Sequence, residues 1–489
     1  MGEAAMRPIR FLLDGEVREL SGVDPTLTVL NLLRYHLRRT GTKEGCAEGD
    51  CGACTVVLAE LGGAERDGGG VRFRAVNACI LFAPMLDGRA LFTVESLAAG
   101  GVLHPVQQAM ADLGGSQCGF CTPGFVMSLY AHQRSGAPND EASLKDALAG
   151  NLCRCTGYGP ILAAGMAMGA SQDADVAALA ETLRTLQSAT PLEVEHKGRR
   201  FLAPRTTEAL ATAVEAHPGA VILAGGTDVG LWVTKQHRAL ATVISLNEVE
   251  ALSRIDDLGD ALRFGAGVRY SDAMAALAGL HPEFGPYVRR IGGTQVRNLG
   301  TVCGNLANGS PIGDMPPALI AAGATLVLRQ GSATRRLPLE AYFLDYGKQD
   351  RAPGEFVEAV EVPRPDPTNL FRLFKLSKRI EQDISAVSLG LNIERAGGVV
   401  TGARIAFGGM AATPKRASAV EAALIGRALT AEAMREAAER LGEDFRPISD
   451  MRASAAYRLQ AARNLLIKAA IEDEAPAAAR LMTLEPACA

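Results

Sequence analysis

Residues 45–55 read GCAEGDCGACT, and the rest of the chain can be organised around this stretch. It places Cys46, Cys51 and Cys54 in a C-x4-C-x2-C spacing, which is typical of plant-type [2Fe-2S] ligands with a fourth cysteine further on. Cys79 is the candidate for that fourth ligand. Glycine tolerates the sharp turns by which such a loop directs backbone N–H groups at sulfur. A structural zinc site is the alternative, but zinc ligands usually come as two C-x2-C pairs, and this stretch holds one.

The composition is that of an ordinary globular protein, with 48% hydrophobic and 21% charged residues among 489. A chain of this length is expected to form about three domains. Its 50 basic and 54 acidic residues give a net charge of −4, which provides no basic field for nucleic acid or anionic membranes. No apolar run approaches the roughly 18 residues of a membrane span, and the N-terminus resembles no secretion signal, so a cytoplasmic location is expected.

Eight of the ten cysteines fall into two sets of four. This grouping favours metal binding over disulfides, and thiols kept for metal indicate a reducing compartment. The second set comprises Cys118, Cys121, Cys153 and Cys155, each pair lying just before a predicted helix whose dipole would favour a negative cluster. C-x2-C with a distant C-x-C is less diagnostic than the first spacing, so zinc stays an open alternative here. Cys303 and Cys488 are left over and are expected to be thiols without a role.

The first 194 residues predict a small sheet domain, a helical domain and a linker. The dipeptide Asp14-Gly15 suits a hairpin turn within residues 8–20. A helix is expected over 28–39, and strands over 55–58, 73–82 and 90–94, so that Cys79 would lie on a strand. Helices are expected over 104–113, 123–134, 143–149 and 160–170, as an antiparallel four-helix domain. Residues 171–194 are predicted to be a fraying helix and a linker.

Two glycine-rich segments mark residues 195–363, where strands and helices alternate. They are LAGGTDVG at 223–230, directly after an apolar strand, and GGTQVRNLGTVCGNLANGSPIGD at 292–314. Glycine-rich loops let backbone N–H groups approach a pyrophosphate. Neither matches G-x-G-x-x-G with a suitably placed acid, which disfavours a Rossmann site. Turns that need positive φ are the structural alternative for each segment. Residues 367–476 predict strands followed by helices, an α+β module.

These parts together resemble the xanthine dehydrogenase family of molybdenum hydroxylases, on the first cysteine loop, CGFCTPG, NLCRCTGY, LAGGTDVG and the second glycine-rich segment. The resemblance extends from about residue 8 to 475. It implies a multidomain α+β fold with a β-grasp ferredoxin-like domain at 7–95, a four-helix iron-sulfur domain at 96–170, a linker at 171–194, a two-subdomain FAD-binding domain of the vanillyl-alcohol oxidase and molybdenum-hydroxylase type at 195–363, and a C-terminal α+β flavoprotein domain at 367–476.

The resemblance also implies which residues hold cofactors. The two sets of four cysteines match the ligands of two [2Fe-2S] clusters, and Gln117 matches a residue that approaches the pterin of a partner. FAD contacts are implied for Ile222, Leu223, Ala224, Gly225, Gly226, Thr227, Asp228, Val229, Phe264, Thr301, Val302, Cys303, Gly304, Asn305, Asp314, Val357 and Lys375. Cys303 departs from the glycine common in the family. Without the resemblance, Phe264 would be a core side chain, Asp314 a helix cap and Lys375 a solvated charge.

The implied function is electron relay in an NAD-dependent xanthine dehydrogenase. Electrons from a molybdenum cofactor on a large molybdopterin-binding subunit would pass through the helical-domain cluster, the ferredoxin-like cluster and FAD to NAD, while hypoxanthine or xanthine becomes urate. Asp228 and Asp383 are the candidates on the NAD side. A heterotetramer of two small and two large subunits is implied. The alternatives are the equivalent part of an aldehyde, nicotinate or CO dehydrogenase, and an electron-transfer module that does not use NAD.

Overall fold

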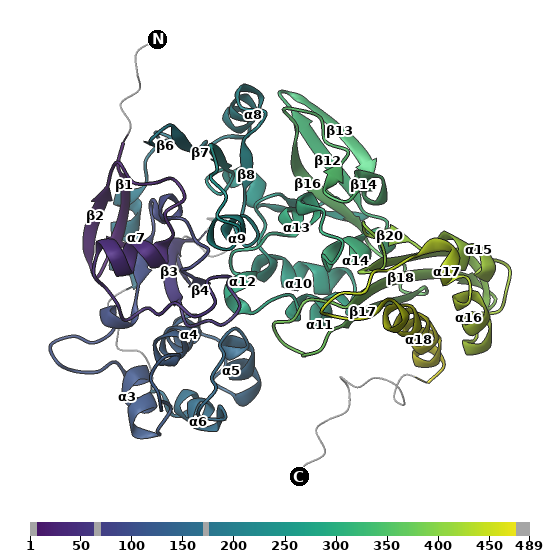
Figure 1. The fold of residues 1–489 in the computed structure, drawn as a ribbon, viewed down its shortest axis with the longest axis horizontal. Coiled ribbons are helices and arrows are strands. Elements are labelled where there is room, and N and C mark those ends of the chain that lie inside the picture. The colour runs from purple at the N-terminus through teal and green to yellow at the C-terminus, as the bar shows by residue number, and fades with distance from the viewer. Residues whose placement is uncertain (1–6, 63–69, 170–175, 476–489) are drawn as a thin grey trace. The chain divides into compact units, whose positions relative to one another are not determined.

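The structure is a computed structural model that describes residues 7–62, 70–169 and 176–475 (Figure 1). It divides into two compact units. The first is formed by residues 1–251, 269–271 and 292–301, and the second by residues 252–268, 272–291 and 302–489. Cys488 lies outside the described residues. Each unit is a mixture of strands and helices, which confirms the predicted multidomain α+β fold class.

The first unit opens with a five-stranded sheet in the order β2-β1-β5-β3-β4. Its strands are β1 (Ile9–Leu13), β2 (Glu16–Leu20), β3 (Thr55–Leu61), β4 (Val71–Asn77) and β5 (Ala90–Phe92). Asp14 and Gly15 turn the predicted hairpin with φ of 55° and 79°. The predicted helix over 28–39 is shorter, because α1 (Val29–Asn31) continues only as a π-helical turn, Leu32–His36, before Arg38 takes a φ of 58°. The prediction that Cys79 lies on a strand was wrong, since β4 ends at Asn77 and Cys79 lies in the turn that follows.

The four predicted helices of the next segment are confirmed. They are α3 (Pro105–Asp112), α4 (Thr122–Arg134), α5 (Glu141–Leu148) and α6 (Gly159–Ala167). Phe125 and Leu144 share one buried core with Val57 and Phe73 of the sheet, so the helices and the sheet pack as a single body. Helix α7 (Val176–Leu186) joins the same core through Leu183 and Leu186. Over its described residues it is therefore a packed helix, and residues 171–175 of the predicted fraying helix lie outside the described part of the chain.

A four-stranded sheet in the order β6-β7-β9-β8 completes the first unit. It contains β6 (Leu192–His196), β7 (Arg199–Ala203), β8 (Val221–Leu223) and β9 (Thr242–Ser245), with helices α8 (Thr207–Ala216), α9 (Val229–Thr234) and α12 (Thr294–Arg297). Strands β7, β9 and β8 run parallel. The first glycine-rich segment leaves the carboxyl end of β8, which is where ligands bind in open sheets of this kind.

The second unit begins with an antiparallel sheet in the order β10-β11-β16-β12-β13. Its elements are β10 (Ile255–Asp257), β11 (Ala261–Gly265), β12 (Thr325–Gln330), β13 (Ala333–Pro338), β14 (Phe343–Asp345), β15 (Lys348–Gln349) and β16 (Phe356–Pro363), with α10 (Tyr270–Leu280), α11 (Phe284–Arg289), α13 (Val302–Asn308) and α14 (Met315–Ala321). Much of the second glycine-rich segment is helical. The residues predicted as a second phosphate loop, 301–305, lie largely in the first turn of α13.

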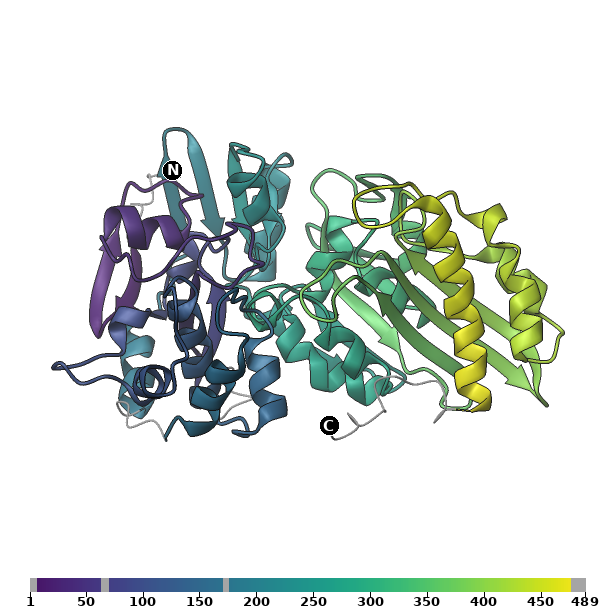
Figure 2. The ribbon, with the colours of Figure 1, turned by 60° about the horizontal axis from the view of Figure 1, so that its bottom comes forward.

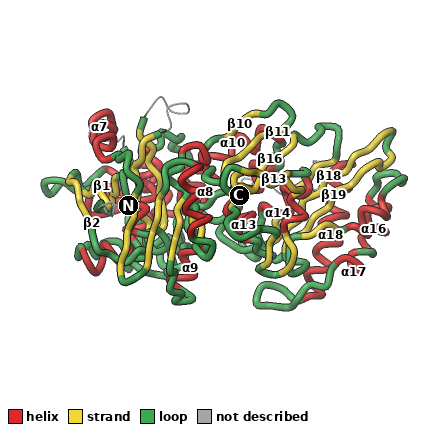
Figure 3. The backbone as a smooth tube through the Cα atoms, turned by 90° about the horizontal axis from the view of Figure 1, so that it is seen from above, coloured by secondary structure: helices red, strands yellow, loops and turns green. Residues whose placement is uncertain are grey.

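The C-terminal part of the second unit packs helices on both faces of a second antiparallel sheet (Figures 2 and 3). The strands are β17 (Leu370–Leu376), β18 (Val387–Ala396), β19 (Val399–Gly408) and β20 (Lys415–Arg416), and the helices that follow are α15 (Ser418–Leu424), α16 (Ala431–Ala438), α17 (Leu441–Asp444) and α18 (Ala455–Glu474). Leu389 and Leu391 of β18 face the core shared with α18. Between them, Gly390 lies against the backbone of α14 on the opposite face. None of the helices in the described parts of the chain is long and apolar enough to cross a membrane.

Candidate cofactor sites

The first cysteine set is gathered by the loop before β3 and the turn after β4. The Cys51 thiol hydrogen-bonds that of Cys46, and the Cys79 thiol that of Cys54. Backbone N–H groups point at sulfur: Cys46 Sγ accepts from Cys51 at 3.3 Å, from Asp50 at 3.4 Å and from Glu48 at 3.5 Å. The Cys51 thiol and these N–H groups outweigh burial and lower the pKa of Cys46 to about 5. A thiolate held by N–H donors suits an iron-sulfur ligand.

The second cysteine set is gathered at the starts of α4 and α6. The Cys155 thiol hydrogen-bonds that of Cys118, and the Cys121 thiol that of Cys153. Burial raises the pKa of Cys153, but hydrogen bonds from the Thr156 side chain and from backbone N–H groups outweigh it and lower the pKa to about 7. Gln117, just before this set, is exposed.

In both sets the four thiols form two hydrogen-bonded pairs. Within the described residues, no three or more His, Cys, Asp or Glu side chains are grouped around a position for a single metal ion. Four thiols with N–H donors to sulfur are the donor set that a [2Fe-2S] cluster takes, so the chemistry of these residues fits two such clusters.

The predicted flavin residues of the first unit form a tight turn between β8 and α9. Ile222 and Leu223 end the strand, and Val229 begins the helix. Gly226 has a φ of 74°, and a Cβ on Gly225 would lie 1.9 Å from the Leu299 carbonyl oxygen, so both positions require glycine. Ala224, Thr227 and Asp228 complete the turn. Burial raises the pKa of the Asp228 carboxyl.

Helix α9 connects this turn to the first cysteine set. A Cβ on Gly230 would meet Ile80 at 2.7 Å, so the helix packs directly on the neighbour of Cys79. One turn later, Thr234 Oγ1 donates to the Ala47 carbonyl oxygen at 2.7 Å, inside the cysteine loop. Helix α9 thus links the predicted flavin turn, which precedes it, to the first cysteine loop, on which it packs within the first unit.

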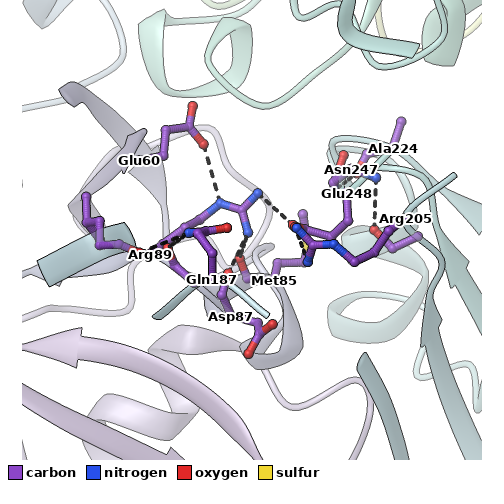
Figure 4. Close-up of polar contacts among 12 residues, drawn as sticks. Glu60, Met85, Asp87, Arg89, Gln187, Arg205, Ala224, Asn247 and Glu248 are labelled. Carbon is purple, nitrogen blue, oxygen red and sulfur yellow. Dashed lines mark hydrogen bonds and ion pairs between the residues drawn. The ribbon is translucent and has the colours of Figure 1, made fainter. Parts of the chain in front are cut away.

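A buried charge network makes a second connection, which the sequence did not predict. Figure 4 shows Arg89 between Glu60 of β3 and Glu248, with Nη2 of Arg89 2.9 Å from Glu248. Arg205 lies beside Glu248, and the neighbouring Asn247 donates through Nδ2 to the Ala224 carbonyl oxygen at 2.9 Å. The network therefore ends on the predicted flavin turn. These residues carry no motif, so only the fold reveals them.

The remaining predicted flavin residues, apart from Thr301 at the end of the first unit, belong to the second unit. Phe264 is fully buried on β11, and Val357 is buried on β16. Val302, Cys303, Gly304 and Asn305 form the start of α13, and Asn305 Oδ1 accepts from the Met315 N–H at 3.2 Å. The Cys303 thiol is buried and donates to the Phe264 carbonyl oxygen at 3.5 Å.

Asp314 and Lys375 form a buried ion pair. Lys375 Nζ lies 2.5 Å from Asp314 Oδ2, and Ser385 Oγ donates to Oδ1 at 2.6 Å. The Asp314 side chain makes no capping bond to α14, and the Lys375 side chain is only 2% exposed. Asp314 does occupy the N-cap position of α14, but its carboxylate binds Lys375 and Ser385 and does not bond the helix N–H groups. The interpretation of Lys375 as a solvated charge was wrong. Asp383, by contrast, accepts from the N–H groups of Arg379 and Ile384 in a local turn of the second unit.

Cys303 is expected to resist alkylation. Burial raises the pKa of its thiol to about 12, so almost no thiolate exists at pH 8. Iodoacetamide should leave Cys303 unmodified in the folded protein and modify it fully after unfolding, as read by peptide mass spectrometry. The exposed Cys118 in iron-free protein is the positive control. Labelling of both thiols at one rate would contradict the buried position.

Comparison with known families places a domain on each of these segments. The matches are to "2Fe-2S iron-sulfur cluster binding domain" over residues 11–84, "[2Fe-2S] binding domain" over 93–166, "FAD binding domain in molybdopterin dehydrogenase" over 194–365 and "CO dehydrogenase flavoprotein C-terminal domain" over 372–472. Together they follow the order in which the sites occur along the chain.

Similar proteins agree with this order. Xanthine dehydrogenase of Emericella nidulans is 30% identical over 86% of this chain and 35% of its own length. Aldehyde oxidase 1 of Rattus norvegicus is 31% identical over 85% of this chain and 36% of its own length, so the chain spans little more than a third of either relative. A solved chain of carbon monoxide dehydrogenase from Hydrogenophaga pseudoflava, 27% identical, matches 55% of this chain and 96% of its own length with a TM-score of 0.53. The chain therefore belongs to the molybdenum hydroxylase family, as the electron-transferring part that carries two [2Fe-2S] domains and an FAD-binding domain.

Proposed function

We propose that this chain is the iron-sulfur and FAD-binding subunit of an NAD-dependent xanthine dehydrogenase. A large molybdopterin-binding subunit would oxidise hypoxanthine or xanthine to urate and supply the electrons, and two copies of each subunit would form a heterotetramer. Bound clusters pass single electrons, and a bound flavin collects two and delivers them as a hydride. The carrying observation is the continuous packing of the second cysteine set, the first cysteine set and the flavin turn within one unit.

The residue roles and domain limits follow the predictions from sequence. The eight cysteines would hold the clusters, and FAD would contact the turn at 222–229, the start of α13 with Thr301, and Phe264, Val357, Asp314 and Lys375. The Lys375–Asp314 pair is buried, so its charges do not serve solubility, and this supports their proposed place in the FAD site. Asp228 and Asp383 are the proposed NAD-side acids. The domain limits proposed are 7–95, 96–170, 195–363 and 367–476, with residues 171–194 between the second and the third.

A CO dehydrogenase is the second candidate, favoured by the matched CO dehydrogenase flavoprotein C-terminal domain at residues 372–472. The solved CO dehydrogenase chain matches 55% of this chain, whereas the xanthine dehydrogenase of Emericella nidulans matches 86% of it in a single chain. Iron-sulfur and flavin segments on one chain therefore support the xanthine dehydrogenase proposal. Aldehyde oxidase 1 shares that arrangement, so use of NAD is the property that needs a direct test.

Metal and flavin analysis of the purified chain, followed by mixing with NADH, tests the proposal. We expect about four iron atoms per FAD and two low-temperature EPR signals on reduction, and bleaching of the flavin by NADH within one stopped-flow trace. Cys54→Ala should remove one EPR signal and about two irons while FAD stays bound. Stoichiometric zinc in place of iron would contradict the relay, and an unbleached flavin would contradict NAD as acceptor.

A further inference from the structure

Four buried polar side chains hydrogen-bond one another next to segments of both cysteine sets. They are Thr55 in β3, Ser128 in α4, Asn151 before Cys153, and Gln295 in α12, and none is more than 3% exposed. They come from four separate segments of the first unit, and three of those segments carry or adjoin cysteine ligands. We call this group the polar knot.

Gln295 is the central donor of the polar knot. Its Nε2 donates to Asn151 Oδ1 at 2.9 Å, to Thr55 Oγ1 at 3.1 Å and to Ser128 Oγ at 3.1 Å. Ser128 Oγ also donates to Asn151 Oδ1 at 2.6 Å. Asn151 Nδ2 in turn donates to the Gly52 carbonyl oxygen at 3.1 Å. The chain of bonds thus runs from Gln295 into the first cysteine loop.

The polar knot adjoins a backbone contact between the two cysteine sets, because Asn151 and Thr55 both donate to the Gly52 carbonyl oxygen. The Leu152 N–H donates to the Cys51 carbonyl oxygen at 3.0 Å, and Leu152 is bonded to Cys153. The backbones touch without intervening side chains: a Cβ on Gly52 would lie 2.2 Å from the Gly150 carbonyl oxygen. A Cβ on Gly124 would lie equally close to the Gly52 carbonyl oxygen, at 2.2 Å. One hydrogen bond and a short run of covalent bonds therefore join a ligand of the first set to a ligand of the second.

Gln295 is itself held in a fixed position. In α12 it precedes Asn298, whose Nδ2 donates to the Ala75 carbonyl oxygen of β4 at 2.9 Å. A Cβ on Gly150 would lie 1.6 Å from Gln295 Oε1, so the amide packs directly on the backbone beside Asn151. A buried amide with three acceptors and no room to move fixes the groups it bonds.

We propose that Gln295 is a positioning residue for electron exchange between the two cysteine sets, acting by holding the Cys51–Leu152 contact. The inference rests on the proposed function, in which both sets hold [2Fe-2S] clusters. One electron leaves the group held by the second set and enters the group held by the first, with no bond made or broken and no proton moved. Electron transfer becomes slower when a hydrogen-bonded contact on its path is replaced by a gap. Loosening the polar knot should therefore slow electron transfer without removing a cysteine ligand.

Gln295→Met tests the proposal in the full-length protein loaded with iron and FAD. Methionine keeps the length and packing of the side chain but removes the three donated bonds. We expect wild-type iron and FAD content, about tenfold faster hydrogen exchange of the peptide containing the Leu152 amide, and a weaker magnetic interaction between the two reduced clusters in low-temperature EPR. Thr294→Val is the matched control, because the Thr294 hydroxyl of the same helix donates to the Asp146 carbonyl oxygen at 2.8 Å, outside the polar knot. Thr294→Val should leave both the hydrogen exchange of the Leu152 peptide and the EPR interaction between the clusters as in the wild type.

Unchanged exchange and unchanged EPR interaction in Gln295→Met would overturn the proposal. If that variant loses iron, Ser128→Ala takes its place, since it removes one acceptor of the Gln295 amide and the donor to Asn151. It should produce both changes to a smaller degree, and wild-type readings would again overturn the proposal. A wild-type protein without two EPR signals would instead contradict the proposed function, so the two failures are distinguishable.

Discussion

Replacing Glu60 by glutamine is expected to lower the local free energy of unfolding by about 3 kcal/mol at neutral pH, the low end of the range for breaking a buried ion pair. The Glu60 side chain is 14% exposed and meets three guanidinium groups. Arg74 Nε lies 2.7 Å away, Arg269 Nη2 3.0 Å and Arg89 Nε 3.4 Å. Glutamine keeps the shape but leaves these cations without their shared anion. Urea-dependent hydrogen exchange of the β3 peptide measures the loss.

The same variant should change the acid sensitivity of the protein. Burial opposes ionisation of Glu60, but Arg269, Arg74 and Arg89 outweigh it and hold the pKa well below its ordinary value of 4.5. The unfolded chain therefore takes up this proton first as pH falls, and the stabilisation present above pH 4.5 is lost progressively below it. Glu60→Gln should show a shallower loss of stability in acid than the wild type.

Glu193→Gln is the matched control for Glu60. Glu193 pairs with one arginine, Arg200, and both side chains are more than a third exposed. Such a pair contributes about 0–1 kcal/mol. An equal effect of the two substitutions would contradict the special position of Glu60 among Arg74, Arg89 and Arg269.

The sequence predicts what local patterns determine. The hairpin at Asp14-Gly15 is set by adjacent residues, and the clustering of Cys46, Cys51 and Cys54 by one loop. The strand predicted through Cys79 failed because an apolar run does not show where hydrogen bonding to a neighbouring strand stops. The second glycine-rich segment was misjudged for a related reason: its glycines suggested a loop, while the buried apolar Val302 and Leu306 favour a helix that packs.

Long-range polar contacts could not be predicted in this way. Glu60 and Arg269 are 209 positions apart, and Gln295 and Thr55 are 240 apart. A single charged or amide residue has no periodicity, so its partner is defined only when the chain folds. Lys375 and Asp314, 61 positions apart, were singled out by family resemblance, but their mutual bond was not foreseen.

Replacing Lys375 by methionine is expected to lower the local free energy of unfolding around β17 by about 3–5 kcal/mol, because the Asp314 carboxylate would stay buried with Ser385 as its remaining side-chain donor. The Asp314 side chain is 9% exposed, so water cannot replace the ammonium group. Hydrogen exchange of the β17 peptide against urea measures the change. The exposed Lys348 offers a control, and Lys348→Met should cost less than about 0.5 kcal/mol.

The double variant Asp314→Asn with Lys375→Met separates packing from cofactor binding. Removing both charges leaves no uncompensated ion, so much of the lost stability should return, with a coupling energy of about 0.5–3 kcal/mol between the two sites. If both side chains also contact FAD, as proposed, flavin affinity measured by fluorescence titration should stay reduced in the double variant although its stability recovers. Recovery of both quantities together would assign the pair to the fold of the second unit alone, whereas recovery of stability without affinity would support its place in the flavin site.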